Sequence, residues 1–154
     1  MKSKIKIQAE DFDVGAELEA LTEGSDAGAP DIGAIVSFTG HVRREGDLTA
    51  LTLEHYPHMT EVEIARLVDE AAGRWPLLAV TVLHRVGSLP PGARIVLVAV
   101  AASHRHAAFE ACEFLIDFLK THAPFWKEEA RGKERHWVAA RGSDEQAASR
   151  WRKE

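Results

Sequence analysis

The chain has 154 residues, of which 45% are hydrophobic and 28% are charged, and its formal net charge is -5. That length and balance suit one domain with a substantial core, spanning residues 1–154. The acidic balance argues against nucleic-acid binding, which needs a basic face. Cys112 is the single cysteine, which excludes an internal disulfide framework and an all-cysteine zinc site.

The sequence contains no recognisable targeting or membrane segment. Its N-terminus lacks the apolar run of a signal peptide. No window of about 18 apolar residues occurs, so we expect no membrane span. We therefore expect a cytoplasmic protein.

The N-terminal third of the chain mixes strand, helix and loop patterns. Residues 5–7 alternate apolar and polar side chains, which predicts a half-exposed strand. A short helix is expected at 13–22, and a loop at 23–30, where Gly, Ser, Asp and Ala dominate. Two further strands, 32–38 and 48–56, are joined by a charged, glycine-bounded loop, and a hairpin is their simplest arrangement.

The middle of the chain predicts a helix followed by two strands. Thr60 and Glu63 match a capping box, and the apolar residues after them recur at helical spacing. A strand is expected at 78–86. The strand expected at 95–102 is apolar on both faces, which indicates a central, covered position. The prolines and glycines between the two strands, at 87–92, indicate a turn.

A second helix is expected to begin at Ser103, which is a favourable N-cap residue. Its apolar stripe comprises Phe109, Cys112, Leu115, Ile116 and Leu119. Lys120 falls in the last turn, where a cation complements the helix dipole. Pro124 then ends the helix, because a proline restricts the backbone of the residue before it.

The end of the chain predicts two short strands and a helical tail. The strands are expected at 125–131 and 135–138, and the short helix lies within the tail, residues 143–154. Strands and helices do not alternate regularly along the chain. The sequence therefore favours the α+β class over a parallel α/β sheet.

Positive charge is concentrated between Ser103 and Lys127, in a chain that is acidic as a whole. His104, Arg105 and His106 stand at the start of the second helix, where free backbone N–H groups favour anions and cations cost helix stability. A costly local choice of this kind indicates a site for a small anion. Solvated surface residues are the alternative interpretation.

Two lysines follow at the other end of that helix. Lys120 and Lys127 are separated by Pro124, so they can converge only if the chain folds back after Ala123. A lysine beside aromatic residues can act as an acid, a base or a nucleophile, although an exposed charge is the commoner role. Arg43 lies in the glycine-bounded loop, a type of loop that often closes over ligands, although an ordinary solvated loop is commoner.

Eight histidines raise the question of a metal site. His55 with His58, and His104 with His106, lack the i,i+4 helical spacing of zinc peptidases, and no cysteine lies near them. We therefore expect no metal ligands. Cys112 lies on an apolar helical stripe, which favours a structural thiol over a nucleophile.

Five sequence strings occur in one order along nearly the whole chain: Phe38-Thr39-Gly40-x-Val42-Arg43, Leu51-x-Leu53-Glu54-His55-Tyr56-Pro57-x-Met59-Thr60, His84-Arg85-Val86-Gly87, Ser103-x-Arg105 with Phe109-Glu110-Ala111, and Leu119-Lys120-Thr121-x-Ala123-Pro124-Phe125-Trp126-Lys127. Their joint occurrence resembles the family of the large, catalytic subunit of molybdopterin synthase.

The resemblance implies an α/β-hammerhead-like fold and a sulfurtransferase that needs no cofactor and no metal. Cyclic pyranopterin monophosphate would receive two sulfurs and become the dithiolene of molybdopterin, in molybdenum cofactor biosynthesis. The sulfur would arrive as a thiocarboxylate on the C-terminal Gly-Gly of a small ubiquitin-like carrier subunit. The large subunit would form a homodimer with one carrier at each outer end, giving a heterotetramer.

The resemblance also implies roles for individual residues. Lys120 would be the main catalytic lysine, and Lys127 would assist it. The implied substrate-binding set is His41, Val42, Arg43, His104, Arg105, Lys120, Lys127, Glu128 and Glu129. Arg43 would act in its own subunit or in the neighbouring one. Both reactants are anions, so the work left to the protein is placement, charge stabilisation and proton movement.

Two positions depart from the family pattern, and two other classes of function stay open. His41 stands where the family often has lysine, and His122 replaces a residue that is often permanently charged. We expect these changes to alter the strength or pH dependence of substrate binding rather than to remove activity. A non-catalytic binding module for a ubiquitin-like partner would bind no pterin, and a histidine-based metal hydrolase would carry zinc. The retained lysines and Arg105 favour the enzyme, since a docking surface does not need them.

Overall fold

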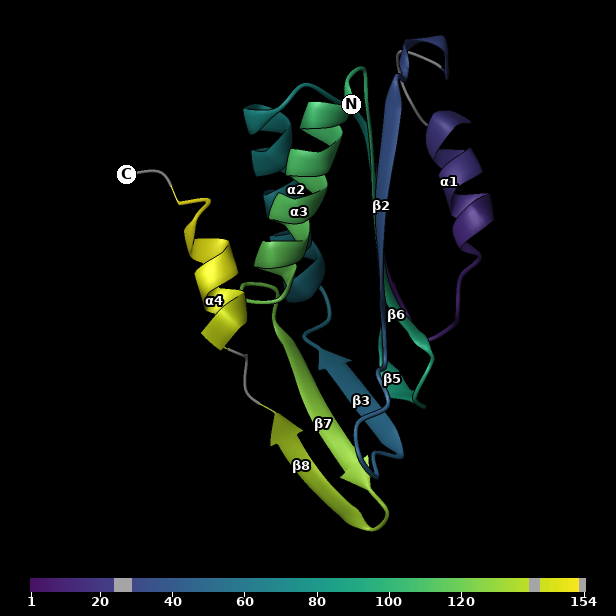
Figure 1. Cartoon of the computed structure of the whole chain (residues 1–154), viewed down its shortest axis with the longest axis vertical. Helices are drawn as coiled ribbons and strands as arrows, with labels where there is room; N and C mark the ends of the chain where they lie inside the picture. The colour runs from purple at the N-terminus through teal and green to yellow at the C-terminus, as the bar shows by residue number, and fades with distance from the viewer. Residues whose placement is uncertain (24–28, 139–141, 153–154) are drawn as a thin grey trace.

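The computed structural model describes residues 1–23, 29–138 and 142–152. Its elements, shown in Figure 1, are β1 (Lys2–Gln8), α1 (Val14–Glu23), the 3-10 helix η1 (Ala29–Asp31), β2 (Ala34–His41), β3 (Ala50–His55), α2 (Met59–Arg74), β4 (Leu77–Arg85), β5 (Gly87–Leu89), β6 (Arg94–Ala102), α3 (Arg105–Leu119), β7 (Phe125–Arg131), β8 (Glu134–Val138) and α4 (Gly142–Ser149). Most of the loop predicted at 23–30 lies outside the described residues.

The larger sheet is mixed and has the strand order β1-β4-β6-β2. Strand β1 runs parallel to β4, and the other neighbours are antiparallel. Strand β6 lies inside the sheet, as its apolar pattern predicted, and its residues from Leu97 to Ala102 have no exposed surface. The central strand of the sheet is therefore covered on both faces.

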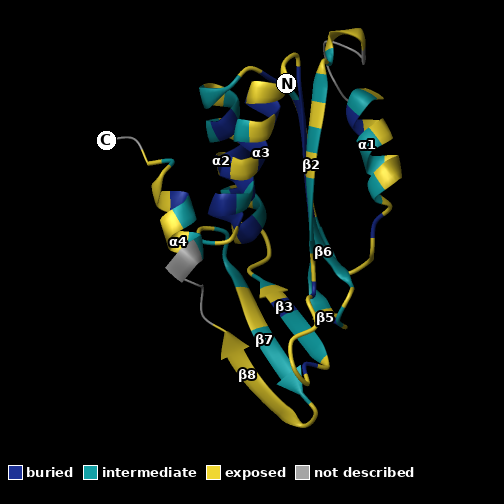
Figure 2. Ribbon diagram, in the orientation of Figure 1, coloured by how far each residue is buried: buried dark blue, intermediate teal, exposed yellow. Residues whose placement is uncertain are grey.

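Helices cover this sheet from both sides: α2 and α3 lie on one face and α1 lies on the other (Figure 1). Because side chains alternate between the faces of a strand, neighbouring residues of β4 and β6 enter different layers. Val82 and Val98 pack in the layer that contains Leu115 of α3, whereas Leu83 packs in the layer that contains Phe12. Figure 2 shows buried residues on the inner sides of α2 and α3.

The smaller sheet has the order β5-β3-β7-β8 and is antiparallel throughout. It extends beyond the end of α3 (Figure 1). Leu53 of β3 is 1% exposed and packs with Val42, Leu48 and Leu89, whereas every residue of β8 is exposed (Figure 2). Two sheets with helices packed on one of them confirm the predicted α+β class.

The strand pairing predicted for 32–38 and 48–56 is wrong. Strand β2 pairs with β6 in the larger sheet, and β3 pairs with β7 in the smaller one, so the two do not form a hairpin. Apolar alternation identifies a strand but does not choose its partner. The turn predicted at 87–92 also contains the three-residue strand β5, which pairs with β3.

Both helix starts differ from the prediction. Helix α2 begins at Met59, and the carboxylate of Glu61 accepts a hydrogen bond of 2.8 Å from the N–H of His58, so the capping box is not the one predicted at Thr60. His58 has a φ of 74°, a region that non-glycine residues rarely adopt. Helix α3 begins at Arg105 with His104, rather than Ser103, as its N-cap residue.

The apolar stripe predicted for α3 is confirmed except at its first member. Cys112, Leu115 and Leu119 are buried, but Phe109 is 60% exposed. The tail helix α4 is confirmed, and Trp151 beyond it donates a hydrogen bond of 2.6 Å from its indole N–H to Asp117 of α3. Within residues 1–23, 29–138 and 142–152, no helix combines the length and apolar character that crossing a membrane requires.

Candidate anion site

The chain folds back after α3, as convergence of the two lysines requires. Lys120 is the C-cap residue, and its N–H donates to the carbonyl of Ile116 at 3.2 Å. The turn closes when the N–H of Phe125 donates to the carbonyl of Ala123 at 2.9 Å. Strand β7 begins at Phe125, directly after the bend, and Lys127 is the third residue of this strand.

A buried histidine lies under this bend. The ring of His84, at the end of β4, stacks on the ring of Phe125 with centroids 3.8 Å apart and an interplanar angle of 17°. Its Nδ1 lies 2.7 Å from the carbonyl oxygen of Arg85. Since a carbonyl only accepts, Nδ1 carries the proton and Nε2 carries a lone pair. His55 is paired with Phe125 in the β3–β7 register, which brings a second imidazole to the same place.

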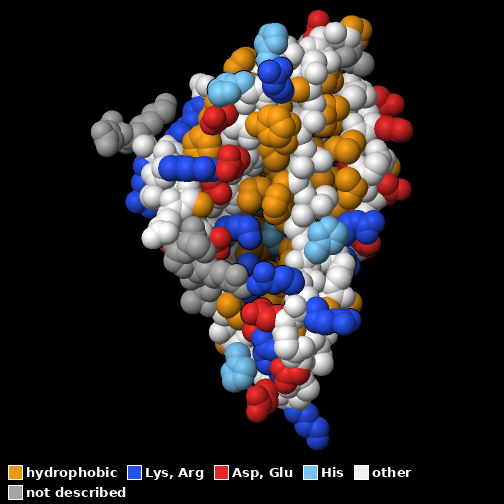
Figure 3. Space-filling view, in the orientation of Figure 1, with side chains coloured by type: hydrophobic (Ala, Val, Ile, Leu, Met, Phe, Trp, Pro, Cys, Tyr) orange, Lys and Arg blue, Asp and Glu red, His pale blue; other side chains and the backbone are white. Residues whose placement is uncertain are grey.

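Both lysines act electrostatically on His84. Burial lowers the pKa of His84 to about 4, the hydrogen bond to the Arg85 carbonyl opposes this shift, and the charges of Lys127, His55 and Lys120 lower the pKa further. His84 is therefore neutral at pH 7, whereas the two lysines are exposed. Figure 3 shows Lys and Arg side chains gathered in this part of the surface, below an apolar band.

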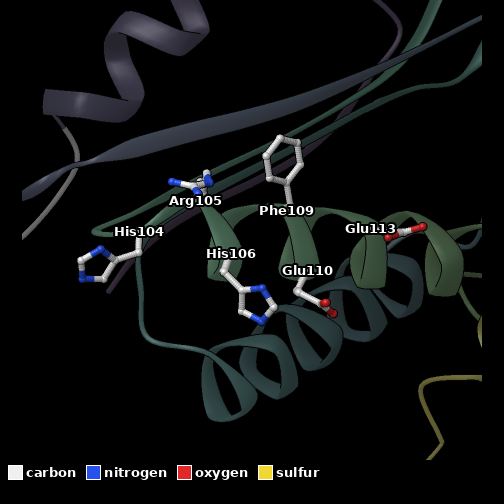
Figure 4. A pocket seen from close by; sticks show the side chains of 6 residues that line it. All are labelled: His104, Arg105, His106, Phe109, Glu110 and Glu113. Carbon is white, nitrogen blue, oxygen red and sulfur yellow. The ribbon is translucent and has the colours of Figure 1, made fainter.

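A second group of cations lies at the opposite end of α3. A concavity of about 420 Å³ is lined by His104, Arg105, His106, Phe109, Glu110 and Glu113. In Figure 4 the side chains of Arg105 and Phe109 lie toward the sheet, and those of His106 and Glu110 lie toward α2. The turn before α3 is fixed by close packing, because a Cβ atom on Gly33 would overlap the carbonyl oxygen of Ser103.

The two cationic groups do not share a pocket within one chain. Helix α3 has 15 residues, so a rise of 1.5 Å per residue separates Arg105 from Lys120 by about 22 Å along the axis. The structure thus brings Lys120 and Lys127 together around His84 but leaves His104 and Arg105 at the far end of the helix.

The predicted residues after β2 occupy the base of a loop. His41 is exposed, with its Nε2 3.4 Å from the Thr39 hydroxyl. Val42 is 3% exposed, its N–H donates to the Ala93 carbonyl at 2.8 Å and its carbonyl accepts from the N–H of Gly92 at 2.6 Å. Val42 therefore fixes the position from which the exposed Arg43 extends.

The two predicted glutamates lie on opposite faces of β7. Because side chains alternate along a strand, Glu129 shares the face of Lys127, and Glu128 lies on the other. Glu129 is 3.2 Å from Arg131, and Glu128 is 3.5 Å from Arg135. Each carboxylate thus has a cationic neighbour within the smaller sheet.

Sequence reasoning assigned no role in the site to His84 or to Thr60. A histidine in an otherwise apolar strand was the available signal for the first residue. The second was interpreted as a helix cap, yet its hydroxyl donates to the Pro124 carbonyl at 2.9 Å. Among the described residues, no three His, Cys, Asp or Glu side chains are grouped so that they could hold a metal ion.

Comparison with known proteins gives consistent matches over nearly the whole chain. The family model described as MoaE protein matches residues 7–122. The molybdopterin synthase catalytic subunit of Mesorhizobium japonicum is 55% identical over 151 residues, which cover 96% of this chain and 92% of that protein.

Solved structures agree with this match. Molybdopterin cofactor biosynthesis protein E from Burkholderia multivorans superposes with a TM-score of 0.83 at 45% identity, covering 98% of this chain and 97% of that one. A complex of subunits 1 and 2 of the molybdopterin-converting factor from Helicobacter pylori contains a chain with a TM-score of 0.73 at 25% identity, covering 90% of this chain and 91% of that one.

Proposed function

The chain belongs to the MoaE protein family, in which the relative described above is a molybdopterin synthase catalytic subunit, and we propose that it is a sulfurtransferase of this type. Its substrates are cyclic pyranopterin monophosphate and the thiocarboxylated C-terminus of a small ubiquitin-like carrier. Its product is the molybdopterin dithiolene. The observation that carries the proposal is the placement of Lys120 and Lys127 around the neutral His84, beside the bend after α3.

This placement suits a reaction between two anions. The thiocarboxylate sulfur is itself a nucleophile, so the protein has to gather like-charged reactants and stabilise the charge that develops. Lys120 is the main catalytic lysine, and Lys127 assists in binding and in proton transfer. The chain's own residues therefore carry the work, without a metal or a resident cofactor.

A second copy of the chain supplies the phosphate-binding cations. Phe109 of α3 is 60% exposed and Ile35 of β2 is 36% exposed, and Figure 3 shows the apolar band over these two elements. Such a patch marks an interface. A twofold axis perpendicular to α3 packs two copies of the helix antiparallel, so that His104 and Arg105 of one copy approach Lys120 of the other.

The remaining partner is the carrier subunit. The Helicobacter pylori structure is a complex of two different subunits, which supports a carrier on each copy of this chain and hence a heterotetramer. Arg43, on its exposed loop, reaches substrate in its own subunit or in the neighbouring one, and His41, Val42, Glu128 and Glu129 complete the binding surface. We place the reaction in the cytoplasm, where a lone thiol such as that of Cys112 stays reduced.

Reconstitution tests this function. The purified chain, a thiocarboxylated carrier and cyclic pyranopterin monophosphate should yield dithiolene product by mass spectrometry, and a carrier that ends in an ordinary carboxylate should yield none. Calorimetry with the precursor alone should show binding. An absence of both product and pterin binding would support the alternative of a non-catalytic binding module. Stoichiometric zinc by elemental analysis would support the histidine-based metal hydrolase.

A further inference from the structure

His84 is held in one orientation and one tautomer. Its ring stacks on Phe125 at 3.8 Å, its Nδ1 donates to the Arg85 carbonyl at 2.7 Å, and only 8% of the residue is exposed. The stack fixes the plane of the ring, and the hydrogen bond fixes its rotation within that plane. The one ring atom left for a further interaction is Nε2, which can only accept a hydrogen bond.

The charged groups near His84 come from three different elements of the fold. Lys127 comes from β7, His55 from β3 and Lys120 from the end of α3, and each disfavours a charge on His84. Its partners in the neighbouring strands, Ile7 of β1 and Val96 of β6, carry no charge. The guanidinium of the adjacent Arg85 is occupied elsewhere, since it donates to the carbonyls of Ala9 and Arg94 at 3.1 Å each.

We infer that His84 is a positioning residue for the lysine pair, and that its Nε2 accepts a hydrogen bond from the ammonium group of Lys120 or Lys127. The inference rests on the proposed function, because it assigns His84 a role in that reaction. A neutral acceptor orients the ammonium group without adding a third positive charge beside it. An acceptor also favours the charged form of a lysine, which is the form that attracts the two anionic reactants.

Three substitutions separate this role from a structural one. In His84→Gln the side-chain amide oxygen can accept at about the position of Nε2, whereas in His84→Asn the amide can replace only the Nδ1 donor. His84→Phe keeps the stack on Phe125 and loses both nitrogens. His136→Gln, on the exposed strand β8, is the matched control.

The inference predicts an order of activities. His84→Gln and His136→Gln should stay close to the unsubstituted chain in dithiolene formation, and His84→Asn and His84→Phe should lose about 10- to 100-fold. In the last two the alkaline limb of the pH–rate profile should move to lower pH, because the lysine loses its acceptor. Equal activities in all variants, or a His84→Asn that exceeds His84→Gln, would overturn the inference.

A measurement without either reactant keeps this test independent of the proposed function and of the folding of the His84 variants. The ¹⁵N resonances of His84 should show a protonated Nδ1 and an unprotonated Nε2. The Nε2 resonance should move markedly in Lys120→Ala or in Lys127→Ala, and it should stay in place in Lys133→Ala, which alters the β7–β8 turn. An Nε2 resonance that is unmoved in both lysine variants contradicts the hydrogen bond, whatever the reaction proves to be.

Discussion

Thr60 and Pro124 are joined by a hydrogen bond of 2.9 Å, in which the threonine hydroxyl donates to the proline carbonyl. The same hydroxyl accepts a hydrogen bond of 3.1 Å from the N–H of Tyr56. Thr60 has no exposed surface. The first turn of α2 therefore holds the bend that separates Lys120 from Lys127. The geometry of the site thus depends on a buried side chain that is hydrogen-bonded to the backbone of the bend.

Replacing this hydroxyl tests that dependence. Thr60→Val keeps the shape of the side chain but leaves the Pro124 carbonyl and the Tyr56 N–H without their partner, which should cost about 1–3 kcal/mol in the free energy of unfolding. Urea denaturation measures the loss, and dithiolene formation should fall with it because the bend shifts. Thr22→Val, at a half-buried position in the last turn of α1 where the hydroxyl donates only to the Glu19 carbonyl of its own helix, should change the free energy by less than about 0.5 kcal/mol.

The lysine at the end of α3 should be required for turnover but not for folding. Lys120 is exposed, so Lys120→Ala should leave the thermal midpoint nearly unchanged and reduce dithiolene formation about 100-fold or more, since a cation placed for the transition state is lost. Lys133→Ala removes an exposed lysine from the β7–β8 turn and should remain fully active. Full turnover by Lys120→Ala, with purified carrier and precursor, would rule out its catalytic role.

Acid should destabilise the fold through His84. Its folded-state pKa of about 4 lies below the ordinary value of 6.5, so the unfolded chain binds more protons between these two pH values. His84 therefore makes its full contribution to the free energy of unfolding above about pH 6.5. This contribution, about 3 kcal/mol, is lost as the pH falls toward 4.

His84→Phe provides the comparison. Its free energy of unfolding is expected to depend less steeply on pH between 6.5 and 4.5 than that of the unsubstituted chain, although it starts from a different value. Chemical denaturation at a series of pH values measures both slopes. Two identical slopes would show that His84 is not the group responsible.

The single thiol should be inert in the folded chain. Burial, and then the negative charge of Glu113, raise the pKa of Cys112 to about 12, and its sulfur lies 3.7 Å from the Val98 carbonyl. Because the thiolate is the reactive form, iodoacetamide at pH 8 should neither label Cys112 nor reduce activity until urea unfolds the chain. Rapid labelling without urea would show that the core around α3 opens more readily than its packing indicates.

Local patterns were sufficient to identify the elements but not their neighbours. The apolar run at 95–102 predicted the covered central strand β6, because burial on both faces leaves a direct mark on composition. The partner of β2 could not be predicted from local patterns, because β2 pairs with a strand far along the chain, with Ala34 opposite Ala102. Phe109 was expected in the core and is 60% exposed, because helical spacing does not distinguish an apolar residue of the core from one on the surface.

The site was predictable as a set of charges rather than as an arrangement. The basic start of α3 and the two lysines after it were visible in the sequence. Pro124 predicted the end of the helix but not the direction that the chain takes after it. The separation of Arg105 from Lys120 could have been calculated from the helix length, but one sequence does not display the second copy of the chain that we propose to bring them together. His84 was visible as a histidine in an apolar strand, but the strand pattern does not show that its ring stacks on Phe125.

Complementation between two inactive variants tests most directly the central claim that each site is built from two copies of this chain. Arg105→Ala and Lys120→Ala, each inactive alone, are mixed, dissociated and reassociated, and sedimentation verifies that dimers form. One of the two sites in a mixed dimer keeps both residues, so dithiolene formation should recover to about a quarter of that of the unsubstituted protein if the chains pair at random. A mixture of verified mixed dimers that stays inactive would contradict the shared site.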